Sequence, residues 1–241
     1  MSPDDILRID GLTKIFFGFR ALDGLSLHVS RGEILGLVGP NGSGKTTCIN
    51  VVSGLYAPED GSIRFDGAEV AGLAQHKLVH RGINRTFQVP KPFMQLSARE
   101  NVEVAIAYGG ARQGEVDAAA LLGSLNLDAV ANRPAAELNS AQQKMLDLAR
   151  ALATKPKLLL VDELAAGLNP AELDWVAAKL KEFARSGMSI IVVEHLMGFI
   201  EQVTDRVVVM NAGKEIFGGT LGEAVQDKQV VEVFLGGGHA H

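Results

Sequence analysis

Short apolar runs bounded by glycines make up the first part of the chain. The segments ILRIDGL, LDGLSLHV and EILGLVG alternate apolar and polar positions over residues 6–38. This pattern predicts strands that form an antiparallel layer and lead into one buried strand. PEDGSIRFDG is expected to form a turn at Asp60-Gly61 and then a further strand.

The spacing of apolar residues becomes helical between about residues 95 and 155. ARENVEVAIAYGG, VDAAALLGSL and AQQKMLDLARALATK are rich in alanine and leucine. These segments predict a helical insert or subdomain.

Two continuous apolar runs, LLLVDE and SIIVVEH, follow the helical region. Such runs are typical of parallel strands that are buried on both faces. Between them PAELDWVAAKLKEFARSG predicts a helix with Pro170 in its first turn and Gly187 at its end. The alternation of strand, helix and strand predicts an α/β core.

Composition and charge narrow the class of protein. Apolar residues make up 47% and charged residues 21% of the 241 residues, an ordinary globular balance. The net charge of −5 argues against a nucleic-acid-binding protein. The single cysteine, Cys48, excludes an internal disulfide and fits a reducing compartment. Because MSPDDILRID has no apolar signal region and no segment reaches about 18 apolar residues, we expect a cytoplasmic chain without direct membrane insertion.

The strongest chemical signal is GPNGSGKTT at residues 39–47, which fits the pattern G-x-x-x-x-G-K-[ST]. It follows a predicted strand and opens the predicted helix TTCINVVSGL, the context that this motif requires. Its glycines allow backbone N–H groups to converge on phosphate oxygens, and the helix N-terminus adds favourable dipole charge. We expect Lys45 to hold the β- and γ-phosphates of ATP and the Thr46 hydroxyl to bind Mg²⁺. The expected nucleotide-binding residues here are Gly39, Asn41, Gly42, Ser43, Gly44, Lys45, Thr46 and Thr47.

A pair of carboxylates ends the apolar run LLLVDE. Asp162 is expected at the carboxyl end of a buried strand, where ligands bind in open α/β sheets, and would bind Mg²⁺ directly or through water. Glu163 is placed to polarise the attacking water. With the phosphate loop, this pair predicts a P-loop NTPase.

Further matches occur in order along the chain. The segment INRTFQ ends in Gln88, LNSAQQ spans residues 138–143, AAGLNP spans residues 165–170 and VVEH ends in His195. In this order they resemble the ATP-binding subunits of ATP-binding-cassette (ABC) transporters, over essentially the whole chain. Each residue alone is also compatible with a purely structural role.

This resemblance implies roles for individual residues. Gln88 would sense the γ-phosphate and Mg²⁺ and contact a membrane partner, and His195 would contact the γ-phosphate. Phe16 aligns with the aromatic residue that stacks on adenine, with Phe17 as the alternative. The expected catalytic residues are Lys45, Gln88, Glu163 and His195, and the expected metal site is Thr46, Gln88 and Asp162. The family's signature sequence corresponds here to a segment whose expected ATP contacts, on the opposite subunit, are Asn139, Ser140 and Gln142.

The resemblance also implies an architecture and a set of partners. It predicts one nucleotide-binding domain over residues 1–238, with a P-loop core, an antiparallel layer and a helical subdomain over about 90–155. Residues 239–241 are expected to form a disordered tail. The partners would be transmembrane permease subunits and a second ATPase subunit, which places the chain at the inner face of the cell membrane.

The segments RTFQVPKPF, LSARENV and ELAAGLNP look like the ATPases of branched-chain amino acid importers, a group that also handles other amino acids, amides and urea. Four positions depart from the usual pattern: Asn139 and Ala141 in the signature segment, Leu164 in place of a proline, and Asn169 where the interface loop often has aspartate. Because the residues expected at the chain's own phosphate site are intact, these departures favour a heterodimer over a homodimer.

Three alternatives remain at this point. One is a regulatory, weakly hydrolysing cassette that binds ATP as a dimer partner. Another is a soluble ABC ATPase of DNA repair or translation, which would carry a second cassette or a long coiled-coil insert. The third is a small-molecule P-loop kinase, which leaves the matches at Gln88, 138–143 and His195 unexplained.

Overall fold

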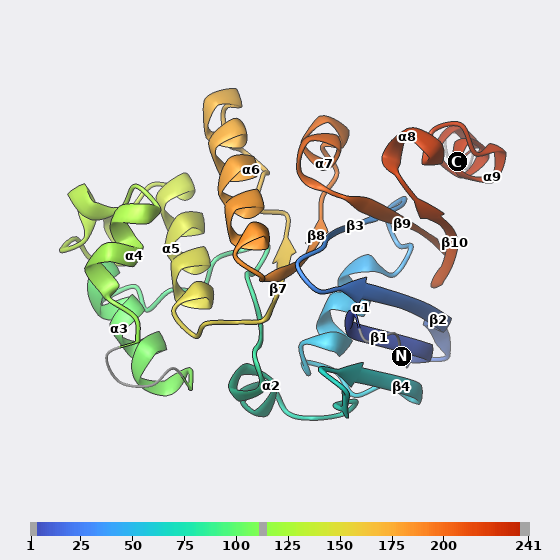
Figure 1. The fold of residues 1–241 in the computed structure, drawn as a ribbon, viewed down its shortest axis with the longest axis horizontal. Helices are drawn as coiled ribbons and strands as arrows, with labels where there is room; N and C mark the ends of the chain where they lie inside the picture. The colour runs from blue at the N-terminus through green and yellow to red at the C-terminus, as the bar shows by residue number, and fades with distance from the viewer. Residues whose placement is uncertain (1–3, 111–114, 237–241) are drawn as a thin grey trace.

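Two β-sheets and a group of helices make up the protein (Figure 1). The computed structural model describes residues 4–110 and 115–236. One sheet has four antiparallel strands in the order β2-β1-β4-β5. Its strands are β1 (Asp5–Phe16), β2 (Phe19–Ser30), β4 (Asp60–Phe65) and β5 (Ala68–Glu69).

The second sheet carries the site. Its six strands lie in the order β10-β9-β3-β8-β7-β6, and all neighbours are parallel except β9 and β10. The strands are β3 (Ile34–Val38), β6 (Ile83–Arg85), β7 (Leu158–Asp162), β8 (Ser189–Val193), β9 (Arg206–Asn211) and β10 (Lys214–Gly219). Because β6, β7, β8 and β3 are adjacent and parallel, their carboxyl ends meet at one edge of the sheet.

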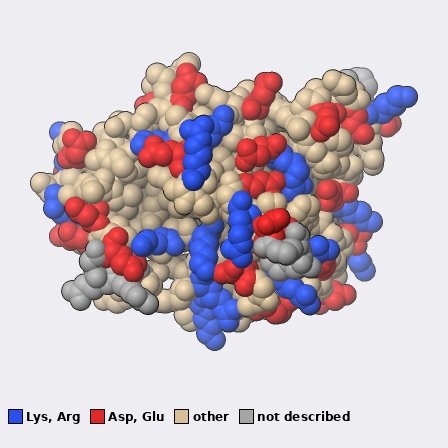
Figure 2. Space-filling view, viewed as in Figure 1, with Lys and Arg blue, Asp and Glu red and all other residues tan. Residues whose placement is uncertain are grey.

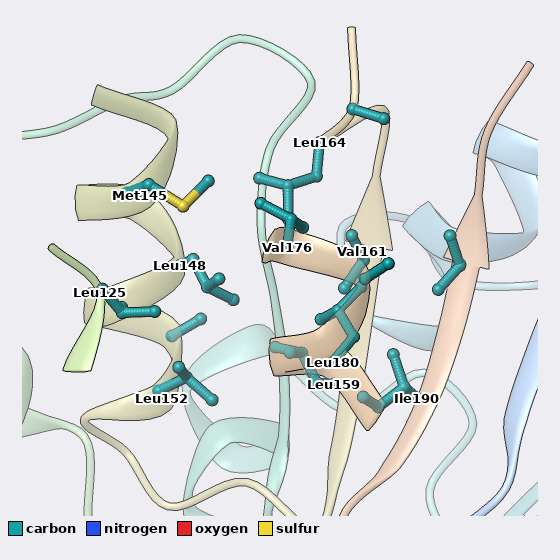
Figure 3. Close-up of a cluster of buried hydrophobic side chains, with 14 of the residues drawn as sticks. Leu125, Met145, Leu148, Leu152, Leu159, Val161, Leu164, Val176, Leu180 and Ile190 are labelled. Atoms are coloured by element: carbon teal, nitrogen blue, oxygen red, sulfur yellow. The ribbon is translucent and has the colours of Figure 1, made fainter. Parts of the chain in front are cut away.

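This sheet separates two hydrophobic cores. Leu159 and Val161 of β7 face the core on the helical side, whereas Leu158 and Leu160 face the core beneath the antiparallel sheet. Burial on both faces explains why β7 and β8 read as continuous apolar runs. Figure 3 shows the helical-side core, where Leu164 lies beside Val176 and faces the leucine side chains of α5.

Helices α3, α4 and α5 pack against one another at one end of the molecule (Figure 1). The helices are α1 (Lys45–Val52), α2 (Gln75–Arg81), α3 (Ala98–Tyr108), α4 (Ala118–Ser124), α5 (Ser140–Leu152), α6 (Pro170–Arg185), α7 (Met197–Val203), α8 (Leu221–Ala224) and α9 (Lys228–Gly236). The α/β class with an antiparallel layer and a helical region is therefore confirmed. The domain limits near residues 90, 155 and 238 stay a prediction, and the expected tail at 239–241 lies outside the described residues.

The surface in Figure 2 shows acidic and basic side chains interspersed, with several basic side chains grouped near the centre of this face. Within residues 4–110 and 115–236, the structure has no helix that is both long and apolar enough to cross a membrane. Cys48 is a small core residue with 1% exposure, and this burial raises the pKa of its thiol to about 12.

Candidate nucleotide-binding site

The glycine-rich loop connects β3 to α1 and has a backbone that only glycine can supply at two points. Gly39 and Gly44 have φ values of 147° and 105°. A Cβ atom at Gly39 would lie 2.2 Å from the Met210 carbonyl oxygen, and one at Gly44 would lie 2.6 Å from the Ala21 carbonyl oxygen. Gly44 is also the N-cap of α1 and provides no side-chain cap. The first N–H groups of α1 therefore remain available to an anion.

Lys45 lies inside this loop and is 5% exposed. Its Nζ donates to the carbonyl oxygens of Gly39 at 2.8 Å and Pro40 at 3.0 Å. Burial lowers the pKa of Lys45, while the nearby carboxylates of Glu163 and Asp162 oppose that shift. The loop thus holds its one lysine through backbone carbonyl oxygens, next to the N–H groups that can bind phosphate in such a loop.

Asp162 ends β7 and is 2% exposed. Its Oδ2 accepts a hydrogen bond from Nη2 of Arg85 at 3.2 Å, a buried ion pair between the ends of β7 and β6. Burial raises the pKa of Asp162, and the Arg85 guanidinium opposes that rise. Its other oxygen, Oδ1, is buried and has no hydrogen-bond donor among the described residues. Such an oxygen is costly unless a cation or water reaches it, so Asp162 fits the expected role of a metal ligand.

Glu163 lies between two residues that the sequence analysis singled out. Its Oε2 accepts from Nε2 of Gln88 at 2.7 Å, and its Oε1 lies 3.1 Å from Nε2 of His195. The Glu163 backbone has φ 50°, a left-handed conformation that is uncommon outside glycine. Three segments from the ends of β6, β7 and β8 therefore meet at one carboxylate.

These groups line one cavity of about 450 Å³ at the edge of the sheet. Its lining consists of Phe16, Phe19, Ala21, Asn41, Gly42, Gly44, Lys45, Thr46, Thr47, Gln88, Glu163 and His195. Of the residues predicted for the chain's own site, only Gly39, Ser43 and Asp162 are missing from this lining. Gly39 and Ser43 belong to the same loop, and Asp162 directly precedes Glu163.

The aromatic side of the cavity contains one residue that the sequence analysis did not single out. Phe16 lines the cavity, and its ring packs edge-on against Tyr56 with centroids 5.1 Å apart. Phe19 pairs with Phe16 across the β1–β2 hairpin and also lines the cavity. Phe17, the alternative to Phe16, lies at the hairpin turn with its side chain fully exposed and outside the cavity. Recognising the hairpin in FFGF could have identified Phe19.

The signature segment lies apart from this cavity. Asn139 is the N-cap of α5, where its Oδ1 accepts from the Gln142 backbone N–H at 2.8 Å, and Ser140 is the first helical residue. Asn139 and Gln142 line a second cavity together with Asn169, the N-cap of α6. The structure therefore does not bring Asn139, Ser140 and Gln142 together with Lys45 within one chain.

Leu164 stands where the family pattern has a proline after the carboxylate pair, and its side chain is 3% exposed in the helical-side core. The leucine side chain anchors the turn among apolar residues (Figure 3).

A phosphate-binding loop, a lysine and two strand-end carboxylates at one edge of a parallel sheet define a P-loop nucleotide-binding protein. Comparison with known proteins identifies the family. Residues 22–166, more than half of the chain, match the family model described as ABC transporter. This chain therefore belongs to the ABC transporter family, as an ATP-binding subunit that hydrolyses ATP.

Relatives of known name resemble the chain over nearly its full length. The high-affinity branched-chain amino acid transport ATP-binding protein BraF of Pseudomonas aeruginosa is 35% identical, over 96% of this chain and 98% of its own. LivG of Escherichia coli K12, which has the same description, is 32% identical over 96% and 98%.

Two solved structures have the same fold. The ADP conformation of MJ1267, an ATP-binding cassette of an ABC transporter, matches with a TM-score of 0.85 and 31% identity over 96% of this chain and 99% of its own. The dimeric post-hydrolysis state of the ATP-binding cassette MJ0796, bound to ADP and Pi, matches with a TM-score of 0.81 and 25% identity over 89% and 98%.

Proposed function

We propose that this chain powers the import of branched-chain amino acids, or of related small polar solutes, through transmembrane permease subunits at the inner face of the membrane. The observation that carries the ATPase part is the Glu163 carboxylate, held between Gln88 and His195 beside the phosphate loop. The names of BraF and LivG support the solute class. These relatives are described as transport proteins and give no support to a regulatory cassette.

The residues of the cavity would divide the work of hydrolysis among them. The loop N–H groups and Lys45 would bind the β- and γ-phosphates, and Phe16 would stack on adenine. Thr46, Gln88 and Asp162 would hold Mg²⁺, which neutralises phosphate charge when bound. Glu163 would take a proton from the attacking water while the water oxygen bonds to the γ-phosphorus and the bond to the β-phosphate oxygen breaks. His195 would orient the Glu163 carboxylate and contact the γ-phosphate.

Transport itself tests the solute class. The chain would be purified in complex with its permease subunits and a second ATPase subunit and reconstituted into vesicles that contain ATP. We expect uptake of radiolabelled leucine, isoleucine or valine when the matching binding protein is added, and no uptake with the Lys45→Ala subunit. ATP hydrolysis that is stimulated by none of these amino acids, but by an amide or urea, would assign another solute of the group. Hydrolysis without any solute stimulation would refute import.

We further propose that the second ATPase subunit is a different chain. The cavity around Lys45 is intact, whereas the signature segment carries Ala141 and an asparagine cap at Asn139. A methyl group at Ala141 restricts the signature backbone, which would approach the γ-phosphate of the ATP bound to the partner subunit. We therefore expect Lys45→Ala to remove most ATPase activity of the complex, and the equivalent change in the partner to remove less. Equal losses, or full activity of this chain as a homodimer, would contradict the unequal arrangement.

A further inference from the structure

The loop that follows β7, residues 163–169, is held by two buried side chains of opposite charge. Lys144 lies on α5, and Glu194 is the residue that directly follows β8. The two side chains reach the loop from different elements and bond to its backbone. Neither residue lines the nucleotide cavity, and neither was singled out from the sequence.

Lys144 is 8% exposed and bonds to three carbonyl groups of this loop. Its Nζ donates to the carbonyl oxygens of Glu163 at 3.1 Å, Leu164 at 3.2 Å and also Ala166. Burial lowers the pKa of Lys144, while the negative charges of Glu194 and Glu163 oppose that shift. One ammonium group can bond to three successive parts of the loop only if the loop curves around it.

Glu194 is 2% exposed and accepts a hydrogen bond from the Ala165 backbone N–H at 2.7 Å. Glu194 directly precedes His195, which lies beside the Glu163 carboxylate. Burial raises the pKa of Glu194, and the positive charge of Lys144 opposes the rise. The loop backbone between Glu163 and Ala166 is therefore held by one buried acceptor and one buried donor.

The backbone conformation of Glu163 is one that its surroundings must stabilise. A glutamate at φ 50° is strained, and such a backbone persists where its surroundings over-determine it. Here the Glu163 N–H donates to the Val193 carbonyl oxygen at 2.9 Å, and Leu164 anchors the turn in the core. Apolar residues could stabilise the fold as well as two buried charges, because desolvation offsets much of what buried charges contribute. A buried lysine and a buried glutamate that both bond to the backbone of this loop therefore point to a role in orienting it.

We propose that Lys144 and Glu194 are positioning residues that hold the Glu163 backbone so that its carboxylate faces the attacking water. This inference rests on the proposed function, in which Glu163 acts on water. Helix α5 begins at the signature segment, which would contact the ATP bound to the partner subunit. Lys144 therefore links this segment, through one helix, to the loop that carries Glu163. Neither residue touches the nucleotide cavity, so both act on turnover and not on ATP binding.

The test compares variants of the assembled transporter by ATPase kinetics. Lys144→Met should lower kcat about 10- to 100-fold, because a misplacement near 1 Å costs rates of that order, with KM for ATP within about threefold. Lys144→Arg keeps a cationic donor and should restore most of kcat. Glu194→Gln keeps an acceptor for Ala165 and should stay within about threefold of wild type, whereas Glu194→Leu should lose about as much as Lys144→Met. Lys228→Met, an exposed lysine of α9 at the other end of the molecule, is the control (Figure 1).

A double variant separates this inference from the proposed function. In the Glu163→Gln background, Lys144→Met should cause little further loss, because residues that act as a unit are not additive. If Glu163→Gln alone keeps the wild-type rate, the proposed role of Glu163 is wrong. If Glu163→Gln is slow but Lys144→Met matches wild type, only the positioning role is wrong. If Lys144→Met does not fold, the pair Glu194→Leu and Glu194→Gln decides, and equal kcat values for that pair refute the proposal.

Discussion

The Glu163 carboxylate and the His195 ring are in direct contact, with Oε1 and Nε2 3.1 Å apart. They belong to different strand ends, because β7 and β8 are parallel neighbours in register from Leu158 opposite Ser189 to Asp162 opposite Val193. The residues that follow each strand therefore emerge side by side. Gln88 joins them from the end of β6, which pairs with β7 on its other side.

Replacing Glu163 with glutamine tests its proposed role as the base. Glu163→Gln keeps the shape of the side chain and its contact with Gln88 but removes the acceptor of the water proton. Because a positioned base contributes about 10²- to 10⁴-fold, we expect kcat of the assembled transporter to fall at least 100-fold while ATP binding survives. Steady-state ATPase rates and nucleotide-binding titrations measure the two effects. A rate near wild type would show that another group activates the water.

Aromatic substitutions test which ring contacts the base. Stacking of a base on an aromatic side chain contributes about 1–3 kcal/mol, so Phe16→Ala should weaken ATP binding about fivefold or more. Phe19→Ala should weaken it as well, because Phe19 lines the same cavity. Phe17→Ala is the matched control from the same hairpin and should leave the affinity unchanged. An effect at Phe17 alone would reverse the assignment; equilibrium titration with a fluorescent ATP analogue gives the affinities.

Arg85 should contribute more to stability than an exposed arginine does. Arg85 is 7% exposed, and its guanidinium bonds to Asp162, Asn50 and Ser53. Removing one partner of a buried ion pair costs about 3–5 kcal/mol, so Arg85→Met should lower the free energy of unfolding by that order. Arg64→Met is the control, because the exposed pair of Arg64 with Glu69 should contribute less than about 1 kcal/mol. Urea unfolding of both variants measures this; equal losses would contradict the buried pairing.

Glu194 predicts a pH dependence of stability. Burial raises its pKa to about 7, above the ordinary value of 4.5. Between these two values the folded protein holds a proton that the unfolded chain releases, so folding becomes less favourable as the pH rises through this window. Each unit of pKa shift corresponds to about 1.4 kcal/mol, which gives an effect of about 3 kcal/mol.

Glu194→Gln isolates this effect, because an amide stays neutral at every pH and resembles the protonated acid. Relative to Glu194→Gln, the wild-type subunit should lose about 3 kcal/mol of unfolding free energy between pH 4.5 and pH 8. Urea unfolding at several pH values gives the difference. If the wild type and the variant change in parallel over this range, Glu194 does not titrate as expected.

Much of the site could be read from contiguous residues. The phosphate loop is one run, GPNGSGKTT, and its function depends on local backbone conformation and on the helix that it opens. Asp162 and Glu163 were recognisable because an apolar run placed them at a strand end. The hydrophobic pattern also predicted β3, β7, β8 and the helices α3, α5 and α6, because burial on one face or two sets the spacing of apolar residues. The elements after residue 196 were not predicted from the sequence.

Other parts depended on contacts between distant segments, and only the tertiary structure decided them. The hairpin register placed Phe19, and not Phe17, in the cavity. The strand order β3-β8-β7-β6 brought His195 and Gln88 to Glu163, and the packing of the fold brought Lys144 and Glu194 to one loop. Hydrophobic periodicity states which face of a strand is buried and says nothing of which strand lies beside it. For that reason the sequence by itself determined the phosphate loop and the strand-end carboxylate pair, and the fold decided which charged side chains bond to the loop that carries Glu163.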